Sequence, residues 1–270
     1  MSHYPLPPLS ASLIVFTFGA IVGSFLNVCI VRIPKGESII RPSSHCPACK
    51  TPISFSDNLP LISYLLLKGC CRSCGERISP RYFVVELLMG SLALALYHEF
   101  GIGLAFFLGF IFVAALIIIS FIDLDVRIVP DIISLPGIAV GLLFSVIGRY
   151  IIDDPLGLIP SPASALIGVV VGGGFLLALA WLYEIFTGVE GMGGGDIKLL
   201  AMIGAFLGWP SIPVTLFFAS LVGSVVGLTC MALTGAGRRL ALPFAPFLSS
   251  GALLFIFFGQ HLIQFYLFPR

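Results

Sequence analysis

Long apolar runs separated by short polar stretches dominate the chain. Seven of them are long enough to cross a bilayer, because a helix of about 20 apolar residues spans its hydrocarbon core. These runs cover residues 11–31, 82–98, 103–123, 132–150, 163–186, 212–234 and 243–264. A shorter run, 197–208, follows three consecutive glycines. The pattern predicts an all-α polytopic membrane protein with about eight transmembrane helices.

The composition supports the membrane assignment. Hydrophobic residues make up 58% of the 270 residues and charged residues only 10%, whereas soluble domains average about 45–50% and 25%. This balance excludes an ordinary soluble domain and makes membrane lipid the expected surrounding. The formal net charge is +1, so the overall charge gives no reason to expect a nucleic-acid partner.

The basic residues are concentrated on one side of this arrangement. The long polar segment 32–81 carries eight of the 14 Lys and Arg residues: Arg32, Lys35, Arg41, Lys50, Lys68, Arg72, Arg77 and Arg81. Since short cytoplasmic loops are rich in Lys and Arg, this segment is predicted to face the cytoplasm, with both chain termini on the other side. The expected organisation is a first transmembrane helix (1–31), a cytoplasmic insert (32–81) and a membrane domain (82–270).

Two Cys-x-x-Cys motifs lie within the insert. They are "CPAC" (Cys46 and Cys49) and "CRSC" (Cys71 and Cys74), and 21 residues separate them. Each motif turns two thiolates toward one ion, and four thiolates complete the tetrahedral shell of a structural zinc site. Two disulfides or free thiols are the alternative, but a cytoplasmic face is reducing. We therefore expect one structural zinc ion bound by these four cysteines.

The remaining cysteines are not expected to bind the metal. Cys70 adjoins the second motif, but the Cys-x-x-Cys spacing favours Cys71 as the ligand. Cys29 and Cys230 lie in apolar runs, where cysteine behaves as a small packing residue.

The acidic residues Asp123 and Asp196 stand at predicted cytoplasmic ends of apolar runs. Asp123 ends the run "AALIIISFID", and Asp196 follows the glycines of "GMGGGDIKLL". Two carboxylates that approach closely share one proton and titrate as a unit. The ionised carboxylate can activate water, while the protonated one can donate to a carbonyl oxygen or a leaving amine. Such a pair would perform aspartic protease chemistry.

The glycines before Asp196 allow a close backbone approach. We therefore expect an extended substrate to lie beside Gly193, Gly194, Gly195 and Lys198. Simpler roles remain open for several acids, because Asp often caps a helix N-terminus. Asp196 could cap the short run 197–208, and Asp131 could cap the run 132–150. Asp125 could pair with Arg127.

Glu86 and Glu184 lie within apolar runs and have no assigned function. Glu86 follows Arg81 by about one helical turn, so the two could form an ion pair. Glu184 could extend to the cytoplasmic edge of the membrane.

Several segments resemble those of the type IV prepilin peptidases. "GMGGGDIKLL" matches the G-x-G-D-x-K motif of that family, and "FIDLDVRIVPD" matches its other aspartate segment. "GSFLNVCIVRIP", "DNLPLISYLLLKG" and the two cysteine motifs match its N-terminal half. The motifs occur in the family's order from Gly23 to Leu207, which makes the resemblance specific.

The resemblance implies a function and a set of residues. Family members are aspartic peptidases of the bacterial inner membrane that remove the basic leader of type IV prepilins and type II secretion pseudopilins. They cleave after a glycine on the cytoplasmic side. Members with the cysteine-bearing insert also methylate the new N-terminus with S-adenosylmethionine. The implied catalytic residues are Asp123 and Asp196, Gly69 is tied to methyl transfer, and the zinc ligands are Cys46, Cys49, Cys71 and Cys74.

The chain departs from the family pattern in two places. The link between the two aspartates is longer, with extra residues near "YIIDDPLGLIPSP", and Cys70 stands where a basic residue is common. The main alternative function is an ion-coupled secondary transporter, because edge carboxylates and glycine-interrupted helices also build ion sites. A second is an assembly protein without enzymatic activity.

Overall fold

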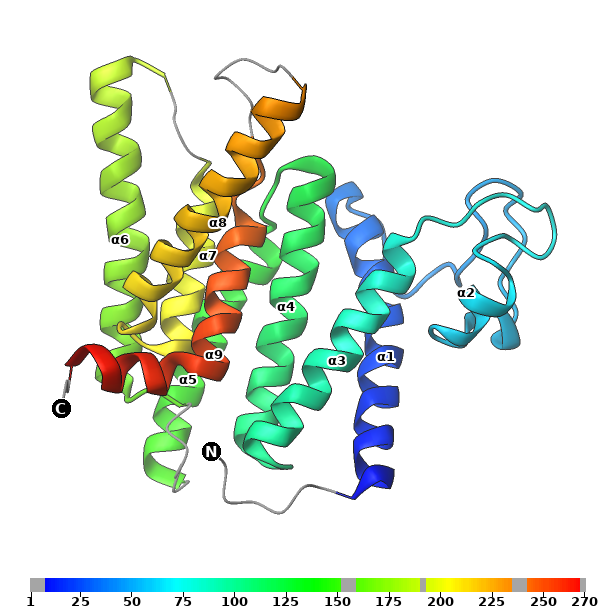
Figure 1. Cartoon of the computed structure of the whole chain (residues 1–270), viewed down its shortest axis with the longest axis horizontal. Coiled ribbons are helices and arrows are strands. Elements are labelled where there is room, and N and C mark those ends of the chain that lie inside the picture. Colours follow the sequence, from blue (N-terminus) through cyan, green and yellow to red (C-terminus); the bar gives the residue numbers. More distant parts are fainter. Residues whose placement is uncertain (1–7, 152–158, 190–192, 235–241, 268–270) are drawn as a thin grey trace. The chain divides into compact units, whose positions relative to one another are not determined.

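The computed structural model describes residues 8–151, 159–189, 193–234 and 242–267. Its long helices follow the predicted apolar runs (Figure 1). They are α1 (Leu9–Arg32), α3 (Arg81–Phe100), α4 (Leu104–Val126), α5 (Asp131–Ile151), α6 (Pro162–Thr187), α7 (Gly194–Leu207), α8 (Ser211–Thr234) and α9 (Ala245–Leu267). The described residues contain no β-strand beyond two isolated bridges. The all-α prediction is therefore confirmed.

Six helices are long and apolar enough to cross a membrane by length and composition: α1, α3, α4, α5, α6 and α8. Among the described residues, α7 has only 14 residues, and the apolar part of α9 covers Ala245–Gly259. The chain is thus a multi-pass membrane protein, while the number of eight crossings stays a prediction.

Local sequence signals explain where several helices end. Ser161 caps α6 by accepting a hydrogen bond from the Ser164 N–H, and Pro162 occupies the first helical position. Gly188 closes the same helix with φ of 68°, a conformation that glycine adopts without strain. The extra residues near "YIIDDPLGLIPSP" lie largely in 152–158, outside the described residues.

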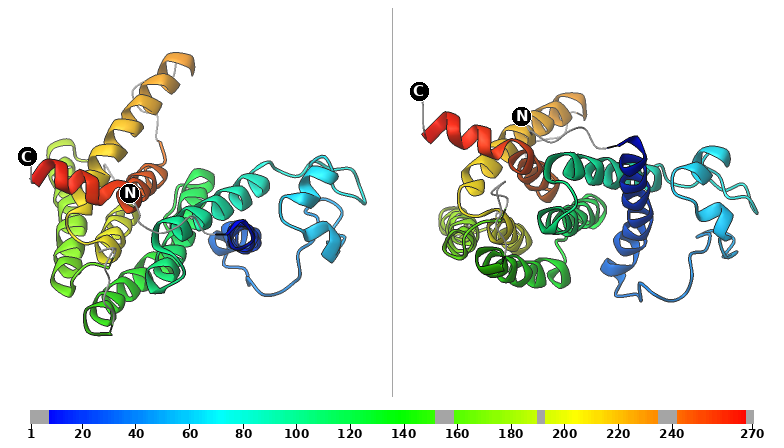
Figure 2. Two further views of the ribbon diagram at one scale, coloured as in Figure 1. Left: turned by 60° about the horizontal axis from the view of Figure 1, so that its bottom comes forward. Right: turned by 90° about the horizontal axis from the view of Figure 1, so that it is seen from below.

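The chain divides into two compact units, Met1–Ile118 and Ile119–Arg270. Residues 82–118 fall in the first unit, although the sequence pattern joins them to the membrane domain. For α3 the reason is its packing on α1, and the two helices lie side by side in Figures 1 and 2. A Cβ added at Gly23 of α1 would lie 2.7 Å from the Glu86 Cα of α3. Small residues thus let the two helix backbones approach closely.

In the second unit, α7 packs against both α5 and α6. Residues 199–205 of α7 are all buried. At Gly204, an added Cβ would overlap the backbone of Gly168 in α6. A short helix that is apolar on every side is stable here because other helices surround it. The core therefore holds the N-terminus of α7, and Asp196 with it, in place.

Candidate active site and metal centre

Asp123 lies in the last turn of α4 and is only 5% exposed. Its Oδ2 accepts a hydrogen bond of 3.0 Å from the backbone N–H of Ala245, the first residue of α9. The N-terminus of a helix carries a partial positive charge, which stabilises a nearby carboxylate. The start of α9 therefore holds the Asp123 side chain within the second unit.

Asp196 stands in the first turn of α7 and is half-buried. The negative charge of Asp123 acts on it, so the two carboxylates lie within electrostatic reach of each other. The fold thus brings together two acids that 72 residues separate in the chain. We call Asp123 and Asp196 the aspartate pair.

Asp196 does not cap α7. Gly193 occupies the N-cap position, and its carbonyl accepts a hydrogen bond from the Asp196 N–H. The capping alternative is therefore wrong, and the carboxylate of Asp196 is free of that structural role.

Lys198 forms an ion pair with Asp131. Its Nζ lies 2.7 and 2.8 Å from the two carboxylate oxygens, and both side chains are partly exposed. Asp131 is the first helical residue of α5 and not the residue before the helix, so its proposed capping role is wrong. The ion pair links the N-terminal parts of α5 and α7. A contact of Lys198 with substrate remains a prediction.

The three glycines before Asp196 have different surroundings. A Cβ added at Gly195 would lie 2.7 Å from the Cβ of Val129, in the segment between α4 and α5. At Gly193 or Gly194, an added Cβ would meet no described atom within 4 Å. Gly195 therefore allows a close approach within the chain itself. Open space is found instead at Gly193 and Gly194.

Asp125 is exposed in the last turn of α4, and Glu184 is exposed on α6. Glu86 is buried in α3, and its Oε2 accepts a hydrogen bond of 2.8 Å from the backbone N–H of Leu61. Glu86 thus connects a membrane helix to the insert, a contact that the sequence pattern did not predict.

The two cysteine motifs form similar turns. The residue after each second cysteine has positive φ, 58° at Lys50 and 74° at Gly75. Its N–H donates a hydrogen bond of 2.9 Å to the carbonyl of the first cysteine, Cys46 or Cys71. Both turns therefore direct two thiols to the same side.

The four Sγ atoms of Cys46, Cys49, Cys71 and Cys74 all lie within 4.8 Å of one another. The Sγ atoms of Cys46 and Cys74 are 3.9 Å apart. A tetrahedron with zinc–sulfur bonds of about 2.3 Å has edges of about 3.8 Å, so the cluster fits a zinc ion. Cys70 lies outside this group, and its thiol donates a hydrogen bond to the Lys68 carbonyl.

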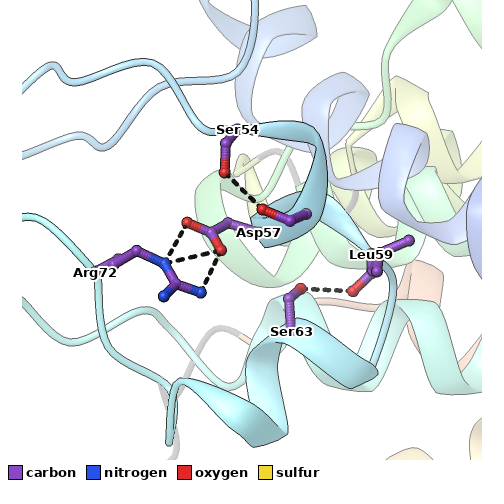
Figure 3. Close-up of polar contacts among 6 residues, drawn as sticks. Ser54, Asp57, Leu59, Ser63 and Arg72 are labelled. Atoms are coloured by element: carbon purple, nitrogen blue, oxygen red, sulfur yellow. Dashed lines mark hydrogen bonds and ion pairs between the residues drawn. The ribbon is translucent and has the colours of Figure 1, made fainter.

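An ion pair ties the second cysteine turn to the rest of the insert (Figure 3). The Nε and Nη2 atoms of Arg72 donate to the carboxylate of Asp57 over 2.7–3.0 Å. These hydrogen bonds and the charge of Arg72 lower the pKa of Asp57. Asp57 belongs to η2 (Phe55–Asn58), which precedes the short helix α2 (Ile62–Leu66). In that helix, Ser63 bonds to the Leu59 carbonyl.

Gly69 joins α2 to the second cysteine turn. Its φ is +67°, and an added Cβ would lie 2.9 Å from the hydroxyl oxygen of Tyr64. The Gly69 N–H also donates to the Tyr64 carbonyl. Glycine is required here both by the backbone conformation and by the ring of Tyr64.

Comparisons with known proteins follow the same division of the chain. The family model "Bacterial Peptidase A24 N-terminal domain" matches residues 17–100, and "Type IV leader peptidase family" matches residues 110–228. The prepilin leader peptidase/N-methyltransferase of Aeromonas salmonicida is 36% identical, with 97% of this chain and 95% of the relative covered. The chain belongs to the type IV leader peptidase family.

Other members of the type IV leader peptidase family are similarly related. The proteins of the same name from Pseudomonas aeruginosa and Neisseria gonorrhoeae are 34% and 37% identical, over 96% and 92% of this chain. The matched regions cover 94% and 89% of these two relatives' own lengths. No solved structure matches the chain. The alternative of a secondary transporter has no support among these relatives.

Replacing Gly195 with valine is expected to destabilise this leader peptidase family member. The new side chain would overlap Val129, and overpacking of this kind typically costs about 1–3 kcal/mol. Thermal unfolding in detergent should therefore show a lower melting temperature for Gly195→Val, whereas Gly194→Val should unfold near the wild-type temperature. Equal melting temperatures for all three proteins would show that the contact with Val129 is unimportant.

Purified protein is expected to contain one zinc ion per chain, bound by four thiolates. Cys71→Ser should lose most of the metal, because serine does not replace a thiolate ligand. Cys70→Ser is the matched control, since this neighbour lies outside the cluster. Elemental analysis measures the zinc content. Full metal retention in a Cys46→Ser/Cys71→Ser double variant would contradict the site.

Two neighbours of this site, Ala245 beside Asp123 and Val129 beside Gly195, could not be predicted from the sequence. Ala245 acts through its backbone N–H, which every residue except proline carries, so no side-chain pattern reveals it. Val129 lies in a short segment between two helices, and nothing in its sequence marks it as the neighbour of Gly195.

Proposed function

We propose that this protein removes the basic leader peptide from type IV prepilins or type II secretion pseudopilins and then N-methylates the new N-terminal residue. Cleavage follows a glycine at the cytoplasmic face of the inner membrane. Membership of the type IV leader peptidase family supports this function, as do the names of the similar proteins.

In the peptidase part of the proposal, the aspartate pair acts as the general acid and the general base. Asp123 and Asp196 approach at the ends of two helices within one unit. With one shared proton, the ionised carboxylate takes a proton from water, whose oxygen attacks the scissile carbonyl carbon. The protonated carboxylate donates to the carbonyl oxygen, and a proton then passes to the leaving amine as the C–N bond breaks. The products are the free leader and a pilin with a new amino terminus.

The substrate must present an unwound segment to this pair. A helix in lipid bonds its own backbone groups, so the scissile bond has to be extended when it is attacked. Gly193 and Gly194, beside which an added Cβ would find open space, suit the approach of an extended chain. Lys198, which forms an ion pair with Asp131, contacts the substrate at the same edge in this proposal.

The methylation half is assigned to the insert and its zinc site, with Gly69 in a supporting role. When bound, S-adenosylmethionine supplies a methyl group to the neutral amine, whose lone pair forms the N–C bond as the C–S bond breaks. The amine then releases a proton, and S-adenosylhomocysteine is the other product. In this proposal, residues 1–31 anchor the chain, 32–81 form the methyltransferase-linked insert, and 82–270 form the peptidase domain.

The preference for glycine before the scissile bond tests the peptidase proposal. Purified protein in detergent is incubated with a prepilin and with the same prepilin carrying valine in place of that glycine. We expect mass spectrometry to show a mature pilin beginning directly after the glycine in the first reaction, with far slower cleavage in the second. An intact natural prepilin after long incubation with folded protein would reject the function.

A further inference from the structure

A cavity of about 600 Å³ lies in the first unit, between the insert and the adjoining ends of α1 and α3. Small-molecule sites typically enclose about 300–1,000 Å³, so this space is large enough for a nucleoside-sized ligand. Figures 1 and 2 show the insert beside α1 and next to the N-terminal end of α3. The proposed cleavage mechanism uses no residue of this cavity.

One residue of the cavity wall, Asn27, carries a buried oxygen that lacks a hydrogen-bond partner. Asn27 of α1 is 1% exposed, and its Nδ2 donates to the Tyr82 carbonyl over 3.1 Å. The Asn27 Oδ1 has no hydrogen-bond partner among the described residues. A buried acceptor without a partner is costly. A hydroxyl or amine donor that reached this oxygen would provide the missing hydrogen bond.

Glu86 supplies a carboxylate to the same wall. It is 7% exposed and accepts the hydrogen bond from the Leu61 N–H. Leu61 has φ of 62° and ψ of −49°, a conformation that is rare for a non-glycine residue and costly to hold. The strained backbone and the carboxylate hold each other in position. A positively charged ligand would favour the ionised form of this buried carboxylate.

Two tyrosines complete the part of the wall that suits such a ligand. Tyr64 and Tyr82 both line the cavity. The hydroxyl of Tyr64 donates to the Ile78 carbonyl, and its ring stands 5.5 Å from that of Phe83. Aromatic faces attract cations and stack with nucleobases. The lining thus offers a carboxylate and aromatic rings together.

We propose that this cavity binds S-adenosylmethionine, with Glu86 and Tyr64 as binding residues; this inference rests on the proposed methylation. The donor carries a sulfonium and an ammonium group, which suit the Glu86 carboxylate. Its adenine suits a tyrosine face, and its ribose hydroxyls and ammonium group are donors for the Asn27 Oδ1. The volume accommodates the whole molecule beside the zinc-held turns.

The same arrangement gives Gly69 a positioning role. Gly69 does not line the cavity, but it packs on Tyr64, and Tyr64 lines the cavity. Any side chain at position 69 would push the Tyr64 ring from its place. Gly69 therefore acts on the donor site through Tyr64.

Calorimetric titration of the full-length protein with S-adenosylmethionine tests the site, because it reads binding without any reaction. Glu86→Gln keeps an oxygen acceptor for the Leu61 N–H but removes the charge. Tyr64→Leu removes the aromatic face. We expect each variant to raise the Kd at least about tenfold, with the wild-type zinc content showing that the insert is folded. Glu99→Gln is the matched control at the other end of α3, and its Kd should match that of wild type.

Wild-type affinity in zinc-loaded Glu86→Gln or Tyr64→Leu would overturn the cavity as the donor site. If the wild-type protein still methylates a pilin in that case, the proposed function stands and the donor binds elsewhere. A wild-type protein that cleaves prepilin but neither binds S-adenosylmethionine nor methylates would remove both the cavity proposal and the methyltransferase half of the function.

Discussion

Asp123→Asn and Asp196→Asn are each expected to lower leader cleavage by at least about a thousandfold. Asparagine keeps the size of the side chain but cannot exchange the proton that the mechanism requires. The fold should survive, because the amide oxygen of asparagine at 123 can still accept the hydrogen bond from the Ala245 N–H. The measurement is the initial rate of leader removal, with melting temperature and zinc content as checks on folding.

Asp125→Asn is the matched control for this prediction. Asp125 lies in the same helical turn of α4 as Asp123 but is exposed, so its replacement should leave substantial activity. Normal cleavage by folded Asp196→Asn would reject the aspartic mechanism. An equal loss in Asp125→Asn would show that the rate depends on the charge of the whole segment.

Gly69→Glu is expected to abolish methylation while leader cleavage continues. The φ of +67° and the contact with Tyr64 both oppose a side chain at this position, whereas the aspartate pair belongs to the other unit. Mature pilin should therefore form at close to the wild-type rate but without the added methyl group. Mass spectrometry of the product distinguishes the two activities.

Two controls separate a local effect of Gly69→Glu from general unfolding. Zinc content should remain at one ion per chain if the cysteine turns keep their geometry. Gly75→Glu is a comparison variant, because Gly75 also has positive φ but its added Cβ would meet no atom within 4 Å; it should retain more methylation. Parallel loss of cleavage and methylation in Gly69→Glu would instead mean that the insert supports the entire fold.

The helices could be predicted from the sequence because each apolar run is long and is bounded by polar, proline or glycine residues. The short run at 197–208 was predicted as a helix, and its burial between α5 and α6 explains why so short a segment is stable. The cysteine cluster could also be predicted, since the spacing of the two motifs indicates one tetrahedral site. The structure brings the four thiols together.

The contacts between distant residues were harder to predict. Asp131 follows a proline and reads as a helix cap, but its partner is Lys198, 67 positions later in the chain. The grouping of α3 with α1 had a usable signal, because Gly19 and Gly23 form a G-x-x-x-G pattern typical of closely packed membrane helices.

The cavity in the first unit had no signal in the sequence. Its wall joins α1, the insert and α3, and only the folded chain brings these segments together. Glu86 illustrates the difficulty, because its position one turn after Arg81 suggested an ion pair. Its carboxylate instead bonds to the backbone of Leu61, and no side-chain pattern predicts a backbone partner.

The most direct test of the whole account is one reaction followed by mass spectrometry. Purified wild-type protein is incubated with a prepilin in detergent, with and without S-adenosylmethionine. We predict that the leader is removed in both reactions and that only the reaction with S-adenosylmethionine yields pilin heavier by one methyl group. A prepilin that stays intact in both reactions, or is cleaved away from the glycine, would contradict the central claim.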